Sequence, residues 1–116
     1  MTAKDFRRIA LTLPEVEERQ HMDHPDFRVG GKIFATLGYP SKGYGMVKLK
    51  PEQQHYFSKK EPKVFQPVTG SWGRQGATCV HLKAATPATL RKAMEEAWRK
   101  TAPKRIAKQL AKPGFM

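Results

Sequence analysis

Hydrophobic residues at the start of the chain recur with the spacing of a helix. Four of them fall at positions i, i+3, i+4 and i+7, which form one helix face: Phe6, Ile9, Ala10 and Leu13. Thr2, followed three residues later by Asp5, matches the pattern of a capping box, and Pro14 predicts the end of the helix. We therefore predict an amphipathic helix between Thr2 and Pro14 that covers part of a core.

Short runs that alternate between apolar and polar residues follow, which is typical of strands. The predicted strands are residues 16–20, 27–29, 32–37, 44–50 and 78–83. Gly30 and Gly31 predict a hairpin turn between the second and third strands, and residues 38–43 predict another turn. Residues 21–25 are expected to form a loop. Residues 59–76 have no clean period and contain several Pro and Gly residues, so we expect a long ordered loop there.

The second half of the chain also predicts helices. Pro51 begins a short helix to about residue 58. Thr86 is an N-cap for a long helix from Pro87 to about residue 100. The apolar face of this long helix holds Leu90, Met94, Ala97 and Trp98. A last short helix is expected after Pro103.

The order of these elements indicates an α+β fold with an antiparallel sheet. N- and C-terminal helices would pack on one face, and the other face would be solvated, as antiparallel sheets permit. We expect one domain over residues 1–103 and a basic helical tail over residues 104–116. The core is expected to contain residues of both helices and sheet: Phe6, Ile9, Leu13, Ile33, Val47, Val80, Leu90, Met94 and Trp98.

Alternation along the strands places basic residues on the face opposite the helices. If Val47 and Leu49 point inward, Lys48 and Lys50 point outward. The same reasoning predicts further outward basic groups at Arg28, Lys32, His81 and Lys83. We therefore expect a cationic sheet face in which a few other groups, such as Phe34 and Met46, are interleaved.

Charge is unevenly distributed along the 116 residues. The chain has 22 Lys and Arg against 10 Asp and Glu, a formal net charge of +12. Residues 1–30 hold 5 basic and 6 acidic side chains, residues 31–82 hold 8 and 2, and residues 83–116 hold 9 and 2. The excess therefore lies after residue 30, which implies one basic side of the molecule. A polyanionic partner is the first interpretation, and a surface that only aids solubility is the alternative.

Composition also narrows the class of protein. Cys79 is the single cysteine, so neither an intramolecular disulfide nor a cysteine zinc cage can form. Such a chain fits a reducing cytoplasm. No run approaches the ~20 apolar residues of a membrane span, and the first residues lack the apolar core of a signal peptide. We therefore expect a cytoplasmic protein without membrane association.

Five stretches carry a family resemblance. They are LPEVEE at residues 13–18, HPDFRVGGKIFATL at 24–37, PEQQ at 51–54, GSWG at 70–73 and AW at 97–98. The chain resembles the MmcQ/YjbR family of small bacterial proteins in these stretches, over residues 1 to about 103. The resemblance implies a frataxin-type α+β sandwich. It also implies DNA binding, which is the usual description of family members, and it supplies no catalytic residues.

Two clusters could carry catalytic or metal chemistry. His21 and His24, with Asp23 and Asp26 beside them, have suitable ligand groups for Zn or Fe. Their spacing matches no established metal motif, and a polar turn is the alternative, so we expect no metal and no cofactor. Cys79 alternates with His81 on one strand face, but a cysteine on a sheet is usually an inert small hydrophobic residue. We therefore expect no catalytic residue and no enzymatic activity.

The stretch from Gly70 to Gly76 is the most unusual part of the sequence. Its glycines allow the backbone to approach a ligand closely. Arg74 could bond a phosphate and Trp72 could stack on a base. Alternatively, Trp72 only caps the end of the core.

The leading prediction is a non-enzymatic, monomeric module that binds nucleic acid without reading its sequence. Double-stranded DNA is favoured over RNA as the partner. Phosphate contacts are expected from Arg28, Lys32, Lys48, Lys50, Arg74, Lys83, Lys104, Arg105 and Lys108. One alternative is a small-molecule-binding protein or enzyme that uses His21, His24, Trp72 and Arg74 on an anionic ligand. Another is a protein-interaction adaptor. Lysines that converge on one surface would favour nucleic acid, and a pocket closed by the Trp72 loop would favour a small ligand.

Overall fold

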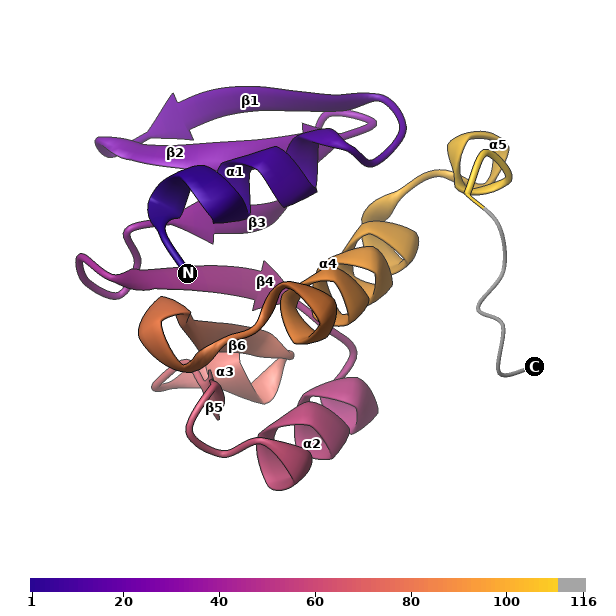
Figure 1. Ribbon diagram of the computed structural model, residues 1–116. Coiled ribbons are helices and arrows are strands. Elements are labelled where there is room, and N and C mark those ends of the chain that lie inside the picture. The colour runs from indigo at the N-terminus through magenta and orange to yellow at the C-terminus, as the bar shows by residue number, and fades with distance from the viewer. Residues whose placement is uncertain (111–116) are drawn as a thin grey trace.

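A six-stranded antiparallel sheet forms the frame of the protein. The computed structural model describes residues 1–110, and Figure 1 shows the arrangement of its elements. The strands are β1 (Val16–His21), β2 (His24–Val29), β3 (Lys32–Leu37), β4 (Tyr44–Lys48), β5 (Phe65–Pro67) and β6 (Ala77–His81). Their order across the sheet is β1-β2-β3-β4-β6-β5, with every neighbouring pair antiparallel.

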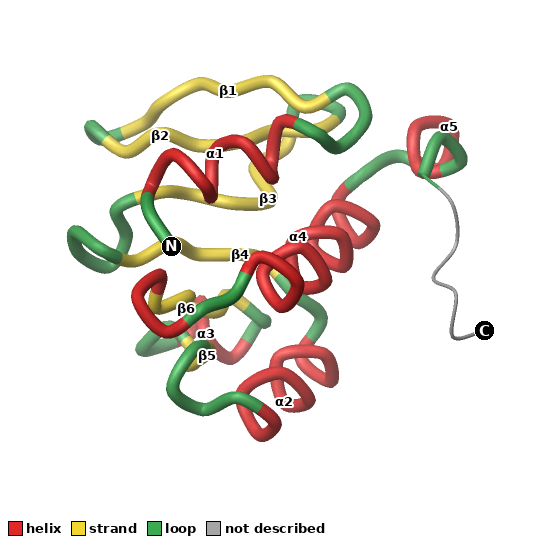
Figure 2. The backbone as a smooth tube through the Cα atoms, viewed as in Figure 1, coloured by secondary structure: helices red, strands yellow, loops and turns green. Residues whose placement is uncertain are grey.

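Helices cover mainly one face of this sheet. They are α1 (Ala3–Leu11), α2 (Pro51–Lys60), α3 (Ser71–Arg74), α4 (Pro87–Thr101) and α5 (Lys104–Ala107), and a 3₁₀ turn spans Leu82–Ala84. In Figures 1 and 2, α1 and α4 lie in front of the sheet, whereas α3 lies behind it beside β6. The predicted α+β fold, with N- and C-terminal helices on one face of an antiparallel sheet, is confirmed.

Two helix starts form as their sequences predict. The hydroxyl of Thr2 accepts a hydrogen bond from the Asp5 backbone N–H at 3.2 Å, and the Asp5 carboxylate accepts one from the Thr2 N–H at 2.8 Å. This reciprocal capping box satisfies two N–H groups that α1 itself cannot pair. Thr86 caps α4 with a single bond, because its hydroxyl accepts from the Thr89 N–H at 3.3 Å.

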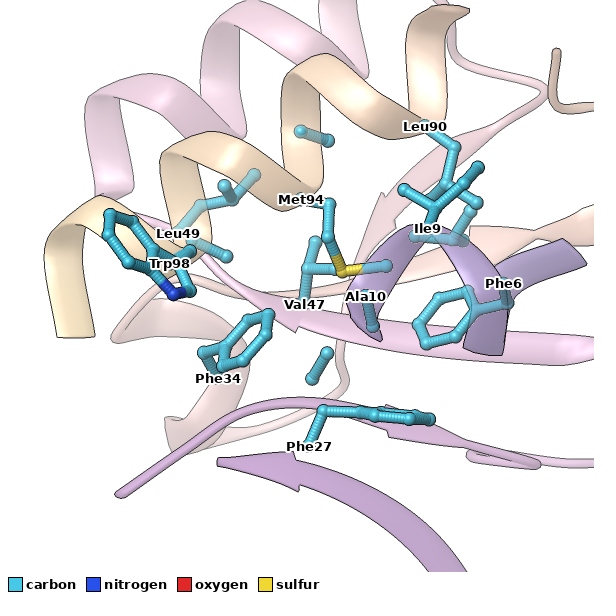
Figure 3. Packing of buried hydrophobic residues seen from close by; sticks show 14 of the residues in the cluster. Phe6, Ile9, Ala10, Phe27, Phe34, Val47, Leu49, Leu90, Met94 and Trp98 are labelled. Carbon is cyan, nitrogen blue, oxygen red and sulfur yellow. The ribbon is translucent and has the colours of Figure 1, made fainter. Parts of the chain in front are cut away.

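The main core fills the space between the sheet and the helices α1 and α4 (Figure 3). Eight of the nine predicted core residues lie in it, and Ile33 is the exception. Trp98 is fully buried, and its indole Nε1 donates a hydrogen bond to the Pro14 carbonyl at 3.0 Å. Ile106 of α5 is also buried in this core, so α5 packs on the domain.

A β-bulge in β3 changes which side chains face the helices. Phe27 lies opposite Ala35, but Arg28 lies opposite Ile33, so Phe34 is an extra residue on its strand. Phe34 is fully buried and points toward α4 near Trp98 in Figure 3. The expectation that Ile33 points inward and Phe34 outward was wrong, because the bulge interrupts the alternation.

The same strand register puts Lys32 on the helix side of the sheet, not on the open face. It lies opposite Val29, whose side chain belongs to the core on the helix side. Lys32 therefore stands at the end of the sheet on the helix side, and its predicted place on the opposite face was wrong.

Several loop predictions were also wrong. Residues 21–25 contain a two-residue turn, in which Met22 and Asp23 have φ values of 49° and 66°. Positive φ at both positions joins β1 and β2 in a tight hairpin. The region predicted as a long loop, residues 59–76, contains β5 and α3.

Two strands are shorter than predicted. β4 and β6 end before Lys50 and Lys83, so Lys50 is the N-cap residue of α2 and Lys83 lies in the 3₁₀ turn.

Candidate functional site

The open face of the sheet, opposite α1 and α4, is partly covered by a second apolar cluster. Its buried residues and the rings packed against them are Met46, Val68, Ala77, Cys79, Tyr39 and Tyr44. The predicted solvated face was therefore wrong at its centre. Burial raises the pKa of the Cys79 thiol, which keeps the sulfur protonated and weakly nucleophilic. His81 stacks on Tyr44 with ring centroids 4.9 Å apart.

A buried carboxylate lies near the β1 edge of the open face. The Asp26 side chain is fully buried, and it accepts hydrogen bonds from Arg28 at 2.8 and 3.1 Å and pairs with His21 Nδ1 at 2.7 Å. Burial by itself would raise the pKa of Asp26, but the bonds from Arg28 and His21 outweigh it and hold this pKa below its usual value. The Asp26 carboxylate in turn raises the pKa of Arg28. Arg28 does lie on the open face, as predicted, but its charge is bound to Asp26.

The His21–Asp26 contact belongs to the cluster that the sequence offered as a possible metal site. Within residues 1–110, no group of three or more His, Cys, Asp and Glu side chains is placed to hold a metal ion. We expect Zn²⁺ or Fe²⁺ at low micromolar concentration to leave the melting temperature unchanged, because a ligand that binds only the native state must raise it. Thermal melts with and without each ion test this. A rise that His24→Ala abolishes would contradict the prediction.

Four rings form a row over the open face. Ring centroids are 6.4 Å apart for His21 and His24, 6.1 Å for His24 and Tyr39, and 5.8 Å for Tyr39 and Trp72. The row joins the first hairpin to α3, which are distant in sequence. Three of the four residues predicted as an alternative ligand site therefore lie together. Tyr39 completes the row, and its position in an ordinary turn sequence gave no signal for this role.

Trp72, at the end of the row, contacts a lysine that lines a basic depression. Lys48 Nζ lies 5.7 Å from the centroid of the Trp72 ring. Lys48 also lines a depression of about 450 Å³ whose other basic residues are Lys32 and Lys100. We call Lys32, Lys48 and Lys100 the lysine corner. Burial, and then the charge of Lys100, lowers the pKa of Lys48.

A gap in strand pairing explains where the lysine corner lies. The pairing of β3 with β4 begins at Ala35 opposite Val47 and ends at Leu37 opposite Gly45. The corner lies beyond the last pair, where Lys32 begins β3, Lys48 ends β4 and the last turn of α4 brings in Lys100. The sequence contains no signal for Lys100 as a site residue, because only the packing of α4 brings it there.

Acidic side chains are gathered elsewhere. All four carboxylates after residue 30, those of Glu52, Glu61, Glu95 and Glu96, line a groove between α2 and α4. Most acidic residues before residue 30 bind nearby Arg or His side chains. No ion pair among residues 1–110 involves a residue of the lysine corner. Within the described residues, the three lysines of the corner are therefore not paired directly with a carboxylate.

The other predicted cations do not form one face. Lys83 lies at the opposite end of the sheet, where it lines a cavity of about 640 Å³ with Arg7, Lys42 and His81. Arg74 is the last residue of α3 and lines neither the cavity with Lys83 nor the depression of the lysine corner. Three cavities in the described part of the chain are lined by neither Trp72 nor Arg74. The Trp72 loop thus presents an exposed ring rather than a wall of these cavities.

The start of α5 lies beside the turn that precedes Lys32. Pro103, which precedes α5, packs so closely on Gly30 that a Cβ at this glycine would stand 2.6 Å from Pro103 Cδ. The turn before Lys32 and the start of α5 are therefore in contact. Lys104 and Arg105 then begin α5, and Lys108 follows it; all three are exposed. The part of the predicted tail over residues 111–116 lies outside the described residues.

These features define a small α+β domain with two helices on one face of an antiparallel sheet. The YjbR family model matches residues 11–100, and the chain belongs to this family. Among solved structures, it is similar to the Deinococcus radiodurans protein DR2400, which contains the domain DUF419. The TM-score is 0.72 at 19% identity, over 97% of this chain and 89% of that chain, which shows a shared fold. A comparison with curated proteins found no match. No helix within residues 1–110 is long and apolar enough to cross a membrane.

Proposed function

We propose that this protein is a non-enzymatic module that binds nucleic acid through backbone phosphates, without reading the base sequence. The lysine corner carries the proposal. Three lysines line one depression, and no acidic residue is among its lining residues. A polyanion is the chemical partner that such an arrangement favours.

The electrostatics of Lys48 support this choice. Its lowered pKa has two causes, burial and the neighbouring charge of Lys100, and both disfavour the ammonium form. A phosphate group at the corner would provide the missing opposite charge. Each phosphate neutralised by lysine also releases counterions from the nucleic acid, which drives binding at low salt.

Further cations would extend the contact. Lys50 follows Lys48 by two residues at the start of α2, and Lys104 and Arg105 belong to α5, whose preceding Pro103 packs against the turn that leads to Lys32. Both duplex and single-stranded nucleic acid offer a phosphate at every nucleotide, so these cations could contact either form. Phosphate contacts hold a protein on its partner but carry no sequence information directly.

A double substitution tests the lysine corner. We expect Lys48→Gln with Lys100→Gln to weaken binding to every sequence alike and to reduce the slope of log K against log salt by about 1 per lost contact. The parent should bind duplex DNA with a Kd of roughly 10⁻⁴–10⁻⁶ M, the range of non-specific complexes. Fluorescence anisotropy of labelled duplexes across a salt series measures both quantities.

The matched control removes the same charge elsewhere. Lys60→Gln with Lys92→Gln lies in the α2–α4 groove and leaves the corner intact, so its binding should fall much less. Equal losses in the two variants would show that only net charge matters. Unchanged binding in the corner variant would reject the corner as the site and direct attention to the cavity with Lys42, His81 and Lys83.

A further inference from the structure

We propose that the protein prefers single-stranded nucleic acid, because Trp72 stacks on an unpaired base whose phosphate is held by Lys48. This inference rests on the proposed function and adds the class of nucleic acid that is bound. In a duplex, the faces of the bases are covered by their neighbours, so a stacking side chain selects unpaired bases. Base–aromatic stacking tolerates every sequence because each base has a π face.

Trp72 has the exposure that stacking requires. Its side chain is 43% exposed, whereas Trp98, the other tryptophan, is fully buried. Burial of aromatic surface is favourable, so an indole left in water next to a charged depression has surface available for a ligand. Trp72 is therefore the accessible aromatic platform beside the lysine corner.

Contacts with neighbouring rings orient the Trp72 side chain. The Trp72 and Tyr39 rings form a T-shaped pair, with 77° between their planes and 5.8 Å between centroids, and Tyr39 forms a second T-shaped pair with His24. Edge-to-face contacts of this kind are favourable arrangements of aromatic pairs. The ring row thus braces the indole from the side of the first hairpin, which reduces the ordering that a bound base would require.

Lys48 connects the two parts of the site. Its ammonium lies over the Trp72 ring, 5.7 Å from the centroid, and it takes part in no ion pair among residues 1–110. A phosphate is a stronger partner for an ammonium than an aromatic ring is. Movement of Lys48 toward a phosphate would uncover the ring for the base of the same nucleotide. Phosphate binding and base stacking are therefore coupled.

Strands with and without bases separate stacking from charge. The probes are oligo(dT), an abasic strand of equal length and charge, and a duplex, each measured by anisotropy at several salt concentrations and by tryptophan fluorescence. We expect oligo(dT) to bind more tightly than the abasic strand and to quench the fluorescence. Trp72→Ala should weaken oligo(dT) binding about tenfold, within the range measured for one stacked base, and leave the abasic strand unchanged.

Two variants make the result specific. Trp72→Phe keeps an aromatic face, so it should retain part of the preference for oligo(dT). Tyr56→Ala removes another exposed ring, 53% exposed on α2, and should have no effect. Equal binding of oligo(dT) and the abasic strand, tighter binding of the duplex, or an inert Trp72→Ala would overturn this inference while leaving the proposed function intact. If none of the three probes binds, both proposals fail.

Discussion

Truncation of Trp98 to alanine is expected to lower the free energy of unfolding by about 3–5 kcal/mol. The indole is fully buried in the main core, where Figure 3 shows it beside Phe34 and Leu49. The variant loses the apolar surface of the ring and leaves a cavity that the sheet and helices cannot fill completely. It also leaves the Pro14 carbonyl without the hydrogen bond from Nε1. Chemical denaturation monitored by circular dichroism measures the loss.

Trp72→Ala is the matched control, because it removes the same side chain from an exposed position. Its effect on the free energy of unfolding should stay below about 1 kcal/mol. If Trp98→Ala does not fold, Trp98→Phe, which leaves a smaller void, should give a measurable and smaller loss. Denaturation curves of Trp98→Ala that superimpose on those of the parent would contradict the arrangement of α4 on the sheet.

Replacement of Asp26 by asparagine is expected to cost about 2 kcal/mol at neutral pH, because hydrogen bonds to a charged group contribute roughly 1.5–3 kcal/mol. Asp26 holds both Arg28 and His21 on the open face of the sheet. The neutral amide keeps the shape of the carboxylate but loses its charge and one of its two acceptor oxygens. Urea denaturation of both proteins at neutral pH measures the difference.

The effect should depend on pH in a defined direction. The native pKa of Asp26 is below its usual value, so the carboxylate stabilises the fold fully above the unfolded pKa of about 3.9. That contribution is lost as the pH falls through the lowered native pKa. The gap between the parent and Asp26→Asn should therefore narrow in acid. Asp23→Asn, at an exposed turn position with positive φ, is the control and should change little. A gap that is absent at pH 7 would contradict the role assigned to Asp26.

Local sequence signals predicted much of the fold because their causes are local. The capping box of Thr2 and Asp5 and the N-cap of Thr86 need only neighbouring residues, and both formed as predicted. The Gly30–Gly31 turn has positive φ at both residues, which glycine adopts without strain. The apolar spacing on α1 and α4 likewise predicted which faces are buried.

Predictions failed where a distant contact changes the local pattern. Alternation predicts outward Phe34, but the bulge opposite β2 turns it into the core. The Met22–Asp23 turn has a backbone conformation that Asn-Gly usually signals, and pairing of β1 with β2 stabilises it without those residues. β5 has only three residues and depends on pairing with β6, so no periodicity in the sequence could reveal it.

Residue patterns were enough to predict the α+β class, the family, the two helices that cover the sheet, and a positive excess confined to the part after residue 30. Tertiary packing sets where these charges lie on the surface. It bound Arg28 to Asp26, gathered the later carboxylates in the α2–α4 groove, and brought Lys100 to Lys48. It also placed Trp72 against Tyr39 and Lys48. This difference arises because helix caps and periodicity act over a few residues, whereas a surface site consists of side chains that meet only after distant segments have packed.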